Sequence, residues 1–146
     1  IADSERAGIA IIYQELALVP ELTVYENIFL GHEISRNGLV DWNETIRRAD
    51  EMLKKVRLSV NPAAKIKDLG VGKQQLVEIA KALSKNVKLL ILDEPTAALM
   101  DAEIEHLFAQ IKRLKAAGTS ILYISHRLEE IQRISDRVRR SDTVAP

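Results

Sequence analysis

Short apolar runs in this chain alternate with longer segments in which apolar residues recur at helical spacing. The run at residues 8–13 is β-branched and continuously apolar, which predicts a strand of a parallel sheet buried on both faces. Residues 89–92 predict a second buried strand and residues 120–124 a third. The last two flank an amphipathic helix that ends at Gly118, with its apolar residues at Ile104, Leu107, Phe108, Ile111 and Leu114.

This strand–helix–strand order predicts a βαβ unit. A crossover of that length makes the two strands parallel and right-handed, so both strands end at the same edge of the sheet. Ligands of open α/β sheets bind at that edge. We therefore expect functional side chains directly after residues 92 and 124.

A helical region separates the first strand from the second. Thr23 with Glu26 and Asp41 with Glu44 have the spacing of helix-capping pairs. A third helix follows a glycine-containing loop at residues 69–72 and carries its apolar face at Leu76, Ile79, Ala80 and Leu83. We expect a core strand and loop at 1–22, a helical subdomain at 23–85, a core βαβ unit at 86–138 and a loose polar tail at 139–146.

Charge and composition exclude several classes of protein. The 146 residues include 21 basic and 21 acidic side chains, so no chain-wide basic field holds nucleic acid. The absence of Cys excludes disulfides, thiol nucleophiles and zinc–thiolate sites. The apolar runs are far shorter than the roughly 20 residues of a membrane span. A basic group near the end favours a solvated helix face because acidic residues intervene; it comprises Arg127, Arg133, Arg137, Arg139 and Arg140.

Polar side chains stand at the expected ends of all three strands. Asp93 and Glu94 follow the second strand, and carboxylate oxygens suit a hydrated Mg²⁺ and an attacking water. His126 follows the third strand and Gln14 the first. The alternatives are an acidic turn before proline, a structural histidine and an amide that satisfies its own loop. Parallel neighbours lie about 4.8 Å apart, so these side chains are within reach of one site.

The loop at residues 69–72 presents backbone N–H groups at a helix N-terminus, an arrangement that suits phosphate but is also common in plain turns. Gly72 and Lys73 imitate the end of a P-loop, G-x-x-x-x-G-K-[ST]. However, Lys67 stands where its first Gly belongs, and Gln74 replaces the Ser or Thr. The sequence contains no P-loop.

The order of these elements resembles the ATP-binding cassette (ABC) family of ATPases over roughly residues 8–138. The stretches Tyr-Gln-Glu at 13–15, Leu-Gly-Val-Gly-Lys-Gln-Gln at 69–75, Leu-Asp-Glu-Pro-Thr at 92–96, Ala-Leu-Met-Asp at 98–101 and Ile-Ser-His at 124–126 match its Q-loop, signature loop, Walker B strand, D-loop and switch histidine. Residues 75–83 and 94–99 look most like the first of two tandem cassettes in bacterial monosaccharide importers of the ribose, xylose and galactose type. The resemblance implies an incomplete P-loop NTPase-like α/β core with an inserted α-helical subdomain.

The resemblance also implies roles for single residues. Asp93 would hold Mg²⁺ through water, Glu94 would be the general base for hydrolysis, and His126 would contact the γ-phosphate of ATP. Gln14 would sense metal and permease together. Because such cassettes pair head to tail, Gly70, Val71 and Gly72 would serve the ATP held by a partner cassette, and Asp101 would couple the two sites.

These roles imply specific partners and a location for the protein. The expected partners are a second cassette, an inner-membrane permease and, indirectly, a sugar-binding protein, with no nucleic acid. The expected location is peripheral, at the cytoplasmic face of the inner membrane. The rival readings are a non-transport ABC protein of translation or DNA repair and a non-catalytic interaction module.

Two departures from the family pattern modify these expectations. In the signature loop, Gly70 stands at the usual serine, Val71 at the first glycine and Lys73 at the glutamine. The family's P-loop lies before the Q-loop, and only thirteen residues precede Gln14. We therefore expect a cassette cut after its main phosphate-binding element, with very weak ATP binding and no turnover by itself. An exposed sheet face and self-association or marginal folding should accompany the cut.

Overall fold

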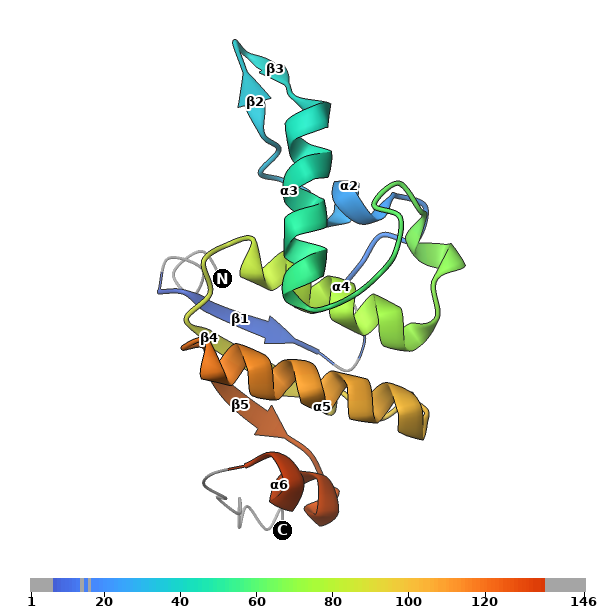
Figure 1. Cartoon of the computed structure of the whole chain (residues 1–146), viewed down its shortest axis with the longest axis vertical. Coiled ribbons are helices and arrows are strands. Elements are labelled where there is room, and N and C mark those ends of the chain that lie inside the picture. The colour runs from blue at the N-terminus through green and yellow to red at the C-terminus, as the bar shows by residue number, and fades with distance from the viewer. Residues whose placement is uncertain (1–6, 14, 16, 136–146) are drawn as a thin grey trace, which may run out of the picture.

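The structure is a computed structural model that describes residues 7–13, 15 and 17–135 (Figure 1). A sheet layer lies beside a helical layer from which a small hairpin projects. In chain order the elements are β1 (Ile9–Ile12), α2 (Val24–Ile28), β2 (Ser35–Arg36), β3 (Leu39–Val40), α3 (Trp42–Lys55), the 3-10 helix η1 (Ile66–Asp68), α4 (Val71–Leu83), β4 (Leu89–Asp93), α5 (Asp101–Ala116), β5 (Ser120–Ile124) and α6 (Leu128–Ile134). None of the helices in these ranges is long and apolar enough to cross a membrane.

Within the described residues, the main sheet has three parallel strands in the order β1-β4-β5. Its register aligns Ile12 with Leu92 and Leu92 with Tyr123. The predicted βαβ unit is present as β4, α5 and β5. All three strands therefore end at one edge, as the sequence pattern predicts.

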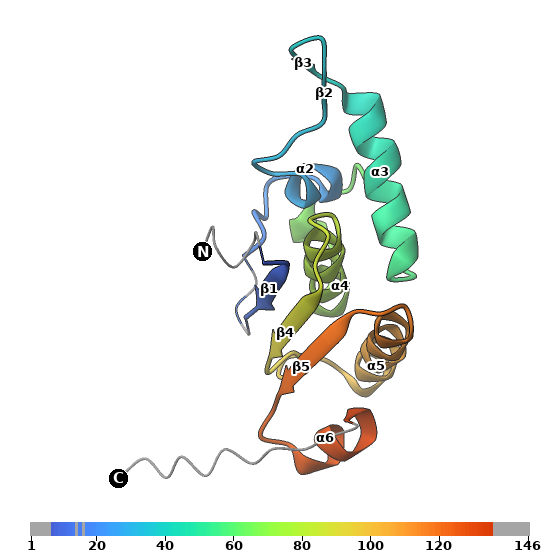
Figure 2. The same ribbon diagram turned by 90° about the vertical axis from the view of Figure 1, so that its left-hand side faces the viewer.

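The two faces of this sheet have different environments. Helix α4 contacts β1, helix α5 contacts β5, and the two helices touch each other (Figure 2). Ile12, Leu90 and Leu92 on the covered face are at most 2% exposed. Alternate residues point the other way, and Ile11 and Leu122 are 42% and 50% exposed.

The prediction that the first strand is buried on both faces is therefore wrong for the described residues. β1 is an edge strand of a sheet that helices cover on one side only, so every second apolar residue remains accessible. The second strand alternates in the same way, between buried and partly buried residues. The expected exposed apolar face is present.

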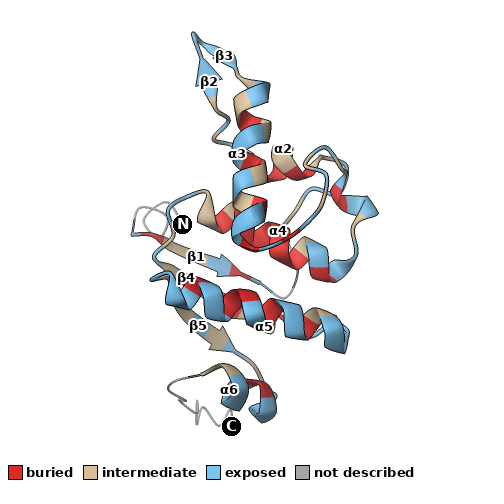
Figure 3. Ribbon diagram, viewed as in Figure 1, coloured by how far each residue is buried: buried red, intermediate tan, exposed pale blue. Residues whose placement is uncertain are grey.

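The helical layer begins at the predicted caps. Thr23 and Glu26 form a reciprocal capping box at α2, and the Asp41 side chain accepts a hydrogen bond from the Glu44 N–H at α3. Helices α2, α3 and α4 pack against one another, and Figure 3 shows buried residues on all three. The residues at their contacts include fully buried apolar side chains. These side chains include Val24, Ile28, Leu53, Val56 and Ile79.

The hairpin formed by β2 and β3 was not predicted. Its turn residues Asn37 and Gly38 both have positive φ, 55° and 80°. That combination is typical of the type I′ turn that Asn-Gly favours between antiparallel strands. Both strands are only two residues long and exposed, so they carry no apolar pattern that announces them.

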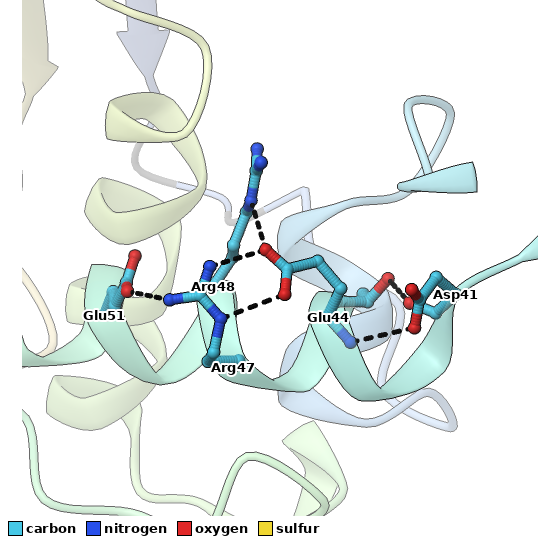
Figure 4. A network of polar contacts seen from close by, with 6 residues as sticks. Asp41, Glu44, Arg47, Arg48 and Glu51 are labelled. Carbon is cyan, nitrogen blue, oxygen red and sulfur yellow. Dashed lines mark hydrogen bonds and ion pairs between the residues drawn. The ribbon is translucent and has the colours of Figure 1, made fainter. Parts of the chain in front are cut away.

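A ladder of ion pairs lines the exposed side of α3. Arg47 bridges Glu44 and Glu51, and Arg48 also contacts Glu44, at 3.1 Å (Figure 4). Hydrogen bonds from Arg47 and then Arg48 lower the pKa of Glu44 to about 2. The ladder is solvated, so it stabilises helix α3 only modestly.

Candidate functional site

The turn after β4 holds two carboxylates at the functional edge. Asp93 is the last residue of β4 and pairs in register with Ile124 of β5. Glu94 follows with a φ of 48°, unusual for a residue with a side chain, and its N–H donates to the carbonyl of Ile124 at 2.9 Å. That bond ties the strained turn to β5 and fixes where the Glu94 side chain starts.

His126 meets Glu94 across this edge. Its Nδ1 lies 2.8 Å from Glu94 Oε1, while the imidazole is 92% exposed and the Glu94 side chain 22% exposed. The structure thus brings together the acid and the histidine that the sequence pattern placed at the ends of neighbouring strands. The imidazole of His126 faces solvent and the carboxylate of Glu94 is mostly shielded from it, so a ligand can approach from the His126 side.

Glu94 Oε1 is buried and receives no aligned hydrogen bond within the described residues, although His126 is close enough for an ion pair. A buried carboxylate oxygen without a donor is costly, and a bound water would satisfy it. No group of three or more His, Asp or Glu residues in the described ranges forms a metal cage. Mg²⁺ typically keeps several waters and needs only one or two carboxylates, so this donor set fits hydrated Mg²⁺ with a triphosphate.

A further carboxylate, missed by the sequence analysis, is hydrogen-bonded to neighbours of both Glu94 and His126. Glu130 of α6 is 6% exposed and accepts hydrogen bonds from three hydroxyl groups. Thr96 Oγ1 donates at 2.7 Å, the Tyr123 hydroxyl at 3.0 Å and Ser125 Oγ at 3.2 Å. Burial raises the pKa of the Tyr123 phenol well above its usual value, so that hydroxyl remains a donor. The sequence signal that could have identified Glu130 is an acidic residue four positions after His126.

The glycine-containing segment lies at the start of α4. Gly70 is the N-cap, and Val71 and Gly72 already belong to the first helical turn, so the predicted loop at 69–72 is shorter than expected. Gly70 and Val71 are exposed. Gly72 is buried against Glu103 of α5, and a Cβ on Gly72 would lie 2.7 Å from Glu103 Cδ. The contact joins the N-terminal turns of α4 and α5.

Asp101 begins α5 on the other side of this contact. It lines an open polar cavity of about 670 Å³ together with His126 and Arg133. Glu103 accepts a hydrogen bond from the Met100 N–H at 2.9 Å and so caps α5. The expected site residues Asp101 and His126 therefore border one cavity. Gly72 contacts Glu103, in the helix that Asp101 begins. Gln14 lies outside the described residues.

Comparisons with known proteins identify the family of this chain. The family model described as "ABC transporter" matches residues 1–97. The xylose import ATP-binding protein XylG of Moorella thermoacetica is 59% identical, and that of Escherichia coli strain K12 is 55% identical, each over 138 residues. Each match covers 94% of this chain and 27% of the relative, so the chain spans about a quarter of the length of these proteins.

Solved structures of ATP-binding cassettes also match this chain, at lower sequence identity. The ADP conformation of an ATP-binding cassette from an ABC transporter is 29% identical, with a TM-score of 0.77 over 92% of this chain and 57% of that one. A dimeric post-hydrolysis cassette bound to ADP and Pi is 30% identical, with a TM-score of 0.67 over 84% and 53%. On the family match, the relatives and the shared fold, this chain belongs to the ABC transporter family.

Proposed function

We propose that this chain is part of the ATP-hydrolysing subunit of a sugar importer, with xylose or a similar monosaccharide as cargo. The observation that carries the proposal is the 2.8 Å contact between Glu94 and His126 at the common end of β4 and β5. The name of the relatives, xylose import ATP-binding protein, supports the proposed cargo. It also favours an importer over a non-transport ABC protein.

In the proposed mechanism, each of three side chains has one role. Glu94 Oε1, which lacks an aligned donor among the described residues, takes the proton of the attacking water. His126, exposed beside it, holds the γ-phosphate with its imidazole. Asp93 would hold a hydrated Mg²⁺ through water, and a bound ion would supply positive charge beside the phosphates.

The exposed start of α4 is the surface that we propose for contact with a second cassette. A helix N-terminus presents unpaired backbone N–H groups, and here Gly70 and Val71 leave them accessible. In our proposal they serve the ATP held by a second cassette, and Asp101 couples the two sites. The complete protein is proposed to dock, as a peripheral subunit at the cytoplasmic face of the inner membrane, on a permease that receives sugar from a binding protein.

This chain alone is expected to bind ATP very weakly and not to turn over. It contains no G-x-x-x-x-G-K-[ST] motif, so it lacks the backbone cradle and Lys that grip the phosphates. The catalytic proposal therefore applies to the natural gene product that contains this sequence.

Uptake of xylose into proteoliposomes tests the proposal. The natural gene product is reconstituted with a xylose permease and its binding protein, and Mg-ATP is enclosed with the cassettes. We expect ATP-dependent uptake that Glu94→Gln abolishes and Glu51→Gln, a matched change on the exposed side of α3, leaves intact. Mg-ATP hydrolysis without uptake of any monosaccharide would refute the importer and favour the non-transport alternative.

A further inference from the structure

We propose that Glu130 is a positioning residue that sets the contact between Glu94 and His126 by tying the turn after β4 to the segment after β5. The inference rests on the proposed function, because it deepens the account of the same site. Glu130 borders the same cavity as Asp101 and His126. It acts through the three hydroxyl groups that donate to its carboxylate, which also pairs with Arg127 at 3.4 Å.

The first step is the anchorage of the turn that carries Glu94. Thr96 lies two residues after Glu94 and is 2% exposed. Its Oγ1 lies 2.7 and 2.8 Å from the two carboxylate oxygens of Glu130. Hydrogen bonds to a buried charged acceptor are short and about twice as strong as neutral ones. Glu130 therefore fixes the far end of the Glu94 turn, whose near end is fixed by the bond to Ile124.

The second step is the anchorage of the segment that carries His126. Ser125 immediately precedes the histidine, and its Oγ donates to Glu130 at 3.2 Å while accepting a bond from the Arg127 N–H at 3.0 Å. The residues on both sides of His126 are thus held by one hydroxyl, and that hydroxyl is held by Glu130. The imidazole itself is 92% exposed, so the anchorage of its backbone bears directly on its position.

Burial of the Glu130 carboxylate costs free energy. A carboxylate that is 6% exposed loses most of its hydration, and an apolar side chain would pack α6 against α5 and β5 without that penalty. Helix α6 also has an independent attachment through Arg133, which pairs with Glu105 and lies over the ring of Phe108. A buried acid with three directed hydroxyl donors restrains direction and distance, which packing alone does not.

The test compares Glu130→Gln with Glu129→Gln, the same change at the exposed neighbouring position on α6, in the natural gene product. Glutamine keeps the size of Glu130, but its amide NH₂ cannot accept a hydroxyl proton. Displacements near 1 Å in an active site cost up to about a hundredfold in rate. We expect kcat for Mg-ATP hydrolysis to fall by roughly tenfold to a hundredfold in Glu130→Gln, with KM for ATP unchanged. Glu129→Gln should keep the wild-type kcat.

A double-mutant comparison separates positioning from stability. Thr96→Val removes the donor and should lower kcat in the same way, and the double variant with Glu130→Gln should be no slower than the slower single variant. Unchanged kcat in folded Glu130→Gln overturns the proposal. A loss that merely follows the unfolded fraction, measured by circular dichroism on the same samples, overturns it as well.

A crystal structure of Glu130→Gln distinguishes failure of the positioning role from failure of the proposed function. We expect Glu94 Oε1 and His126 Nδ1 to be farther apart than in a matched wild-type crystal, even if the wild-type protein hydrolyses no ATP. Absence of hydrolysis by the wild type would refute the proposed function alone. An unchanged distance would refute the positioning role of Glu130 alone.

Discussion

Asn27 of α2 is a polar side chain that the fold encloses completely, with 0% exposure. Its Oδ1 accepts a hydrogen bond from the Val19 N–H at 2.7 Å. Its Nδ2 donates to the carbonyls of Val19 and Thr23 at 3.1 and 2.9 Å. One amide thus fastens the segment between β1 and α2 to the helix, and through it to the helical layer.

Asn27→Asp preserves the shape of this side chain but reverses half of its hydrogen bonding. One carboxylate oxygen can still accept from Val19, whereas the other faces the carbonyls of Val19 and Thr23 instead of donating to them. Each buried group left unsatisfied costs about 1–3 kcal/mol, and the buried charge adds to this cost. We expect a loss of about 2–5 kcal/mol in the free energy of unfolding at pH 7.

Urea denaturation of this chain, followed by circular dichroism, measures the loss. Asn43→Asp is the matched control, because Asn43 is exposed in the first turn of α3, where a negative charge is tolerated. The control should change stability by less than about 0.5 kcal/mol. Equal midpoints for Asn27→Asp and Asn43→Asp would refute the assignment of Asn27 as a structural anchor.

Three further predictions follow from the structure. Burial raises the pKa of Glu78. The Glu78 carboxyl therefore does not destabilise the fold below its unfolded-state pKa, and its cost to the free energy of unfolding grows as pH rises through the folded-state pKa. Glu78→Gln should raise the urea midpoint at pH 7 and leave it nearly unchanged at pH 4. A Cβ in Gly72→Ala would displace Glu103 from its cap on α5. The change should therefore stabilise the fold by about 1 kcal/mol only in the Glu103→Ala background. Equal effects of Gly72→Ala in both backgrounds, measured by thermal melts, would contradict this. Leu122→Lys charges the exposed sheet face and should shift this chain toward monomer in sedimentation velocity, whereas unchanged self-association would exclude that face as the contact.

The elements that the sequence predicted correctly are those in which local and long-range preferences agree. Thr23 and Asp41 cap helices whose apolar faces also pack into the core, and residues 89–92 form a strand in the predicted βαβ unit. The meeting of Glu94 and His126 followed from topology, since parallel strands end at one edge. In each case a short pattern was sufficient.

The features that escaped prediction depend on contacts between distant residues. A run such as Ile9–Ile12 does not reveal which strand lies at an edge or whether one face of a sheet lacks a helix. The Glu130 network joins side chains from three separate segments, and none of them is unusual alone. The hairpin had only the Asn37 and Gly38 pair as a signal, because its strands are exposed and two residues long.

The most direct measurement is the rate of Mg-ATP hydrolysis by the natural gene product with and without Glu94→Gln, with nucleotide binding measured on the same samples. A general base contributes about a hundredfold to ten-thousandfold to a rate. The account predicts a loss of at least about a hundredfold in the variant, with ATP still bound. A Glu94→Gln protein that hydrolyses ATP at the wild-type rate would contradict it.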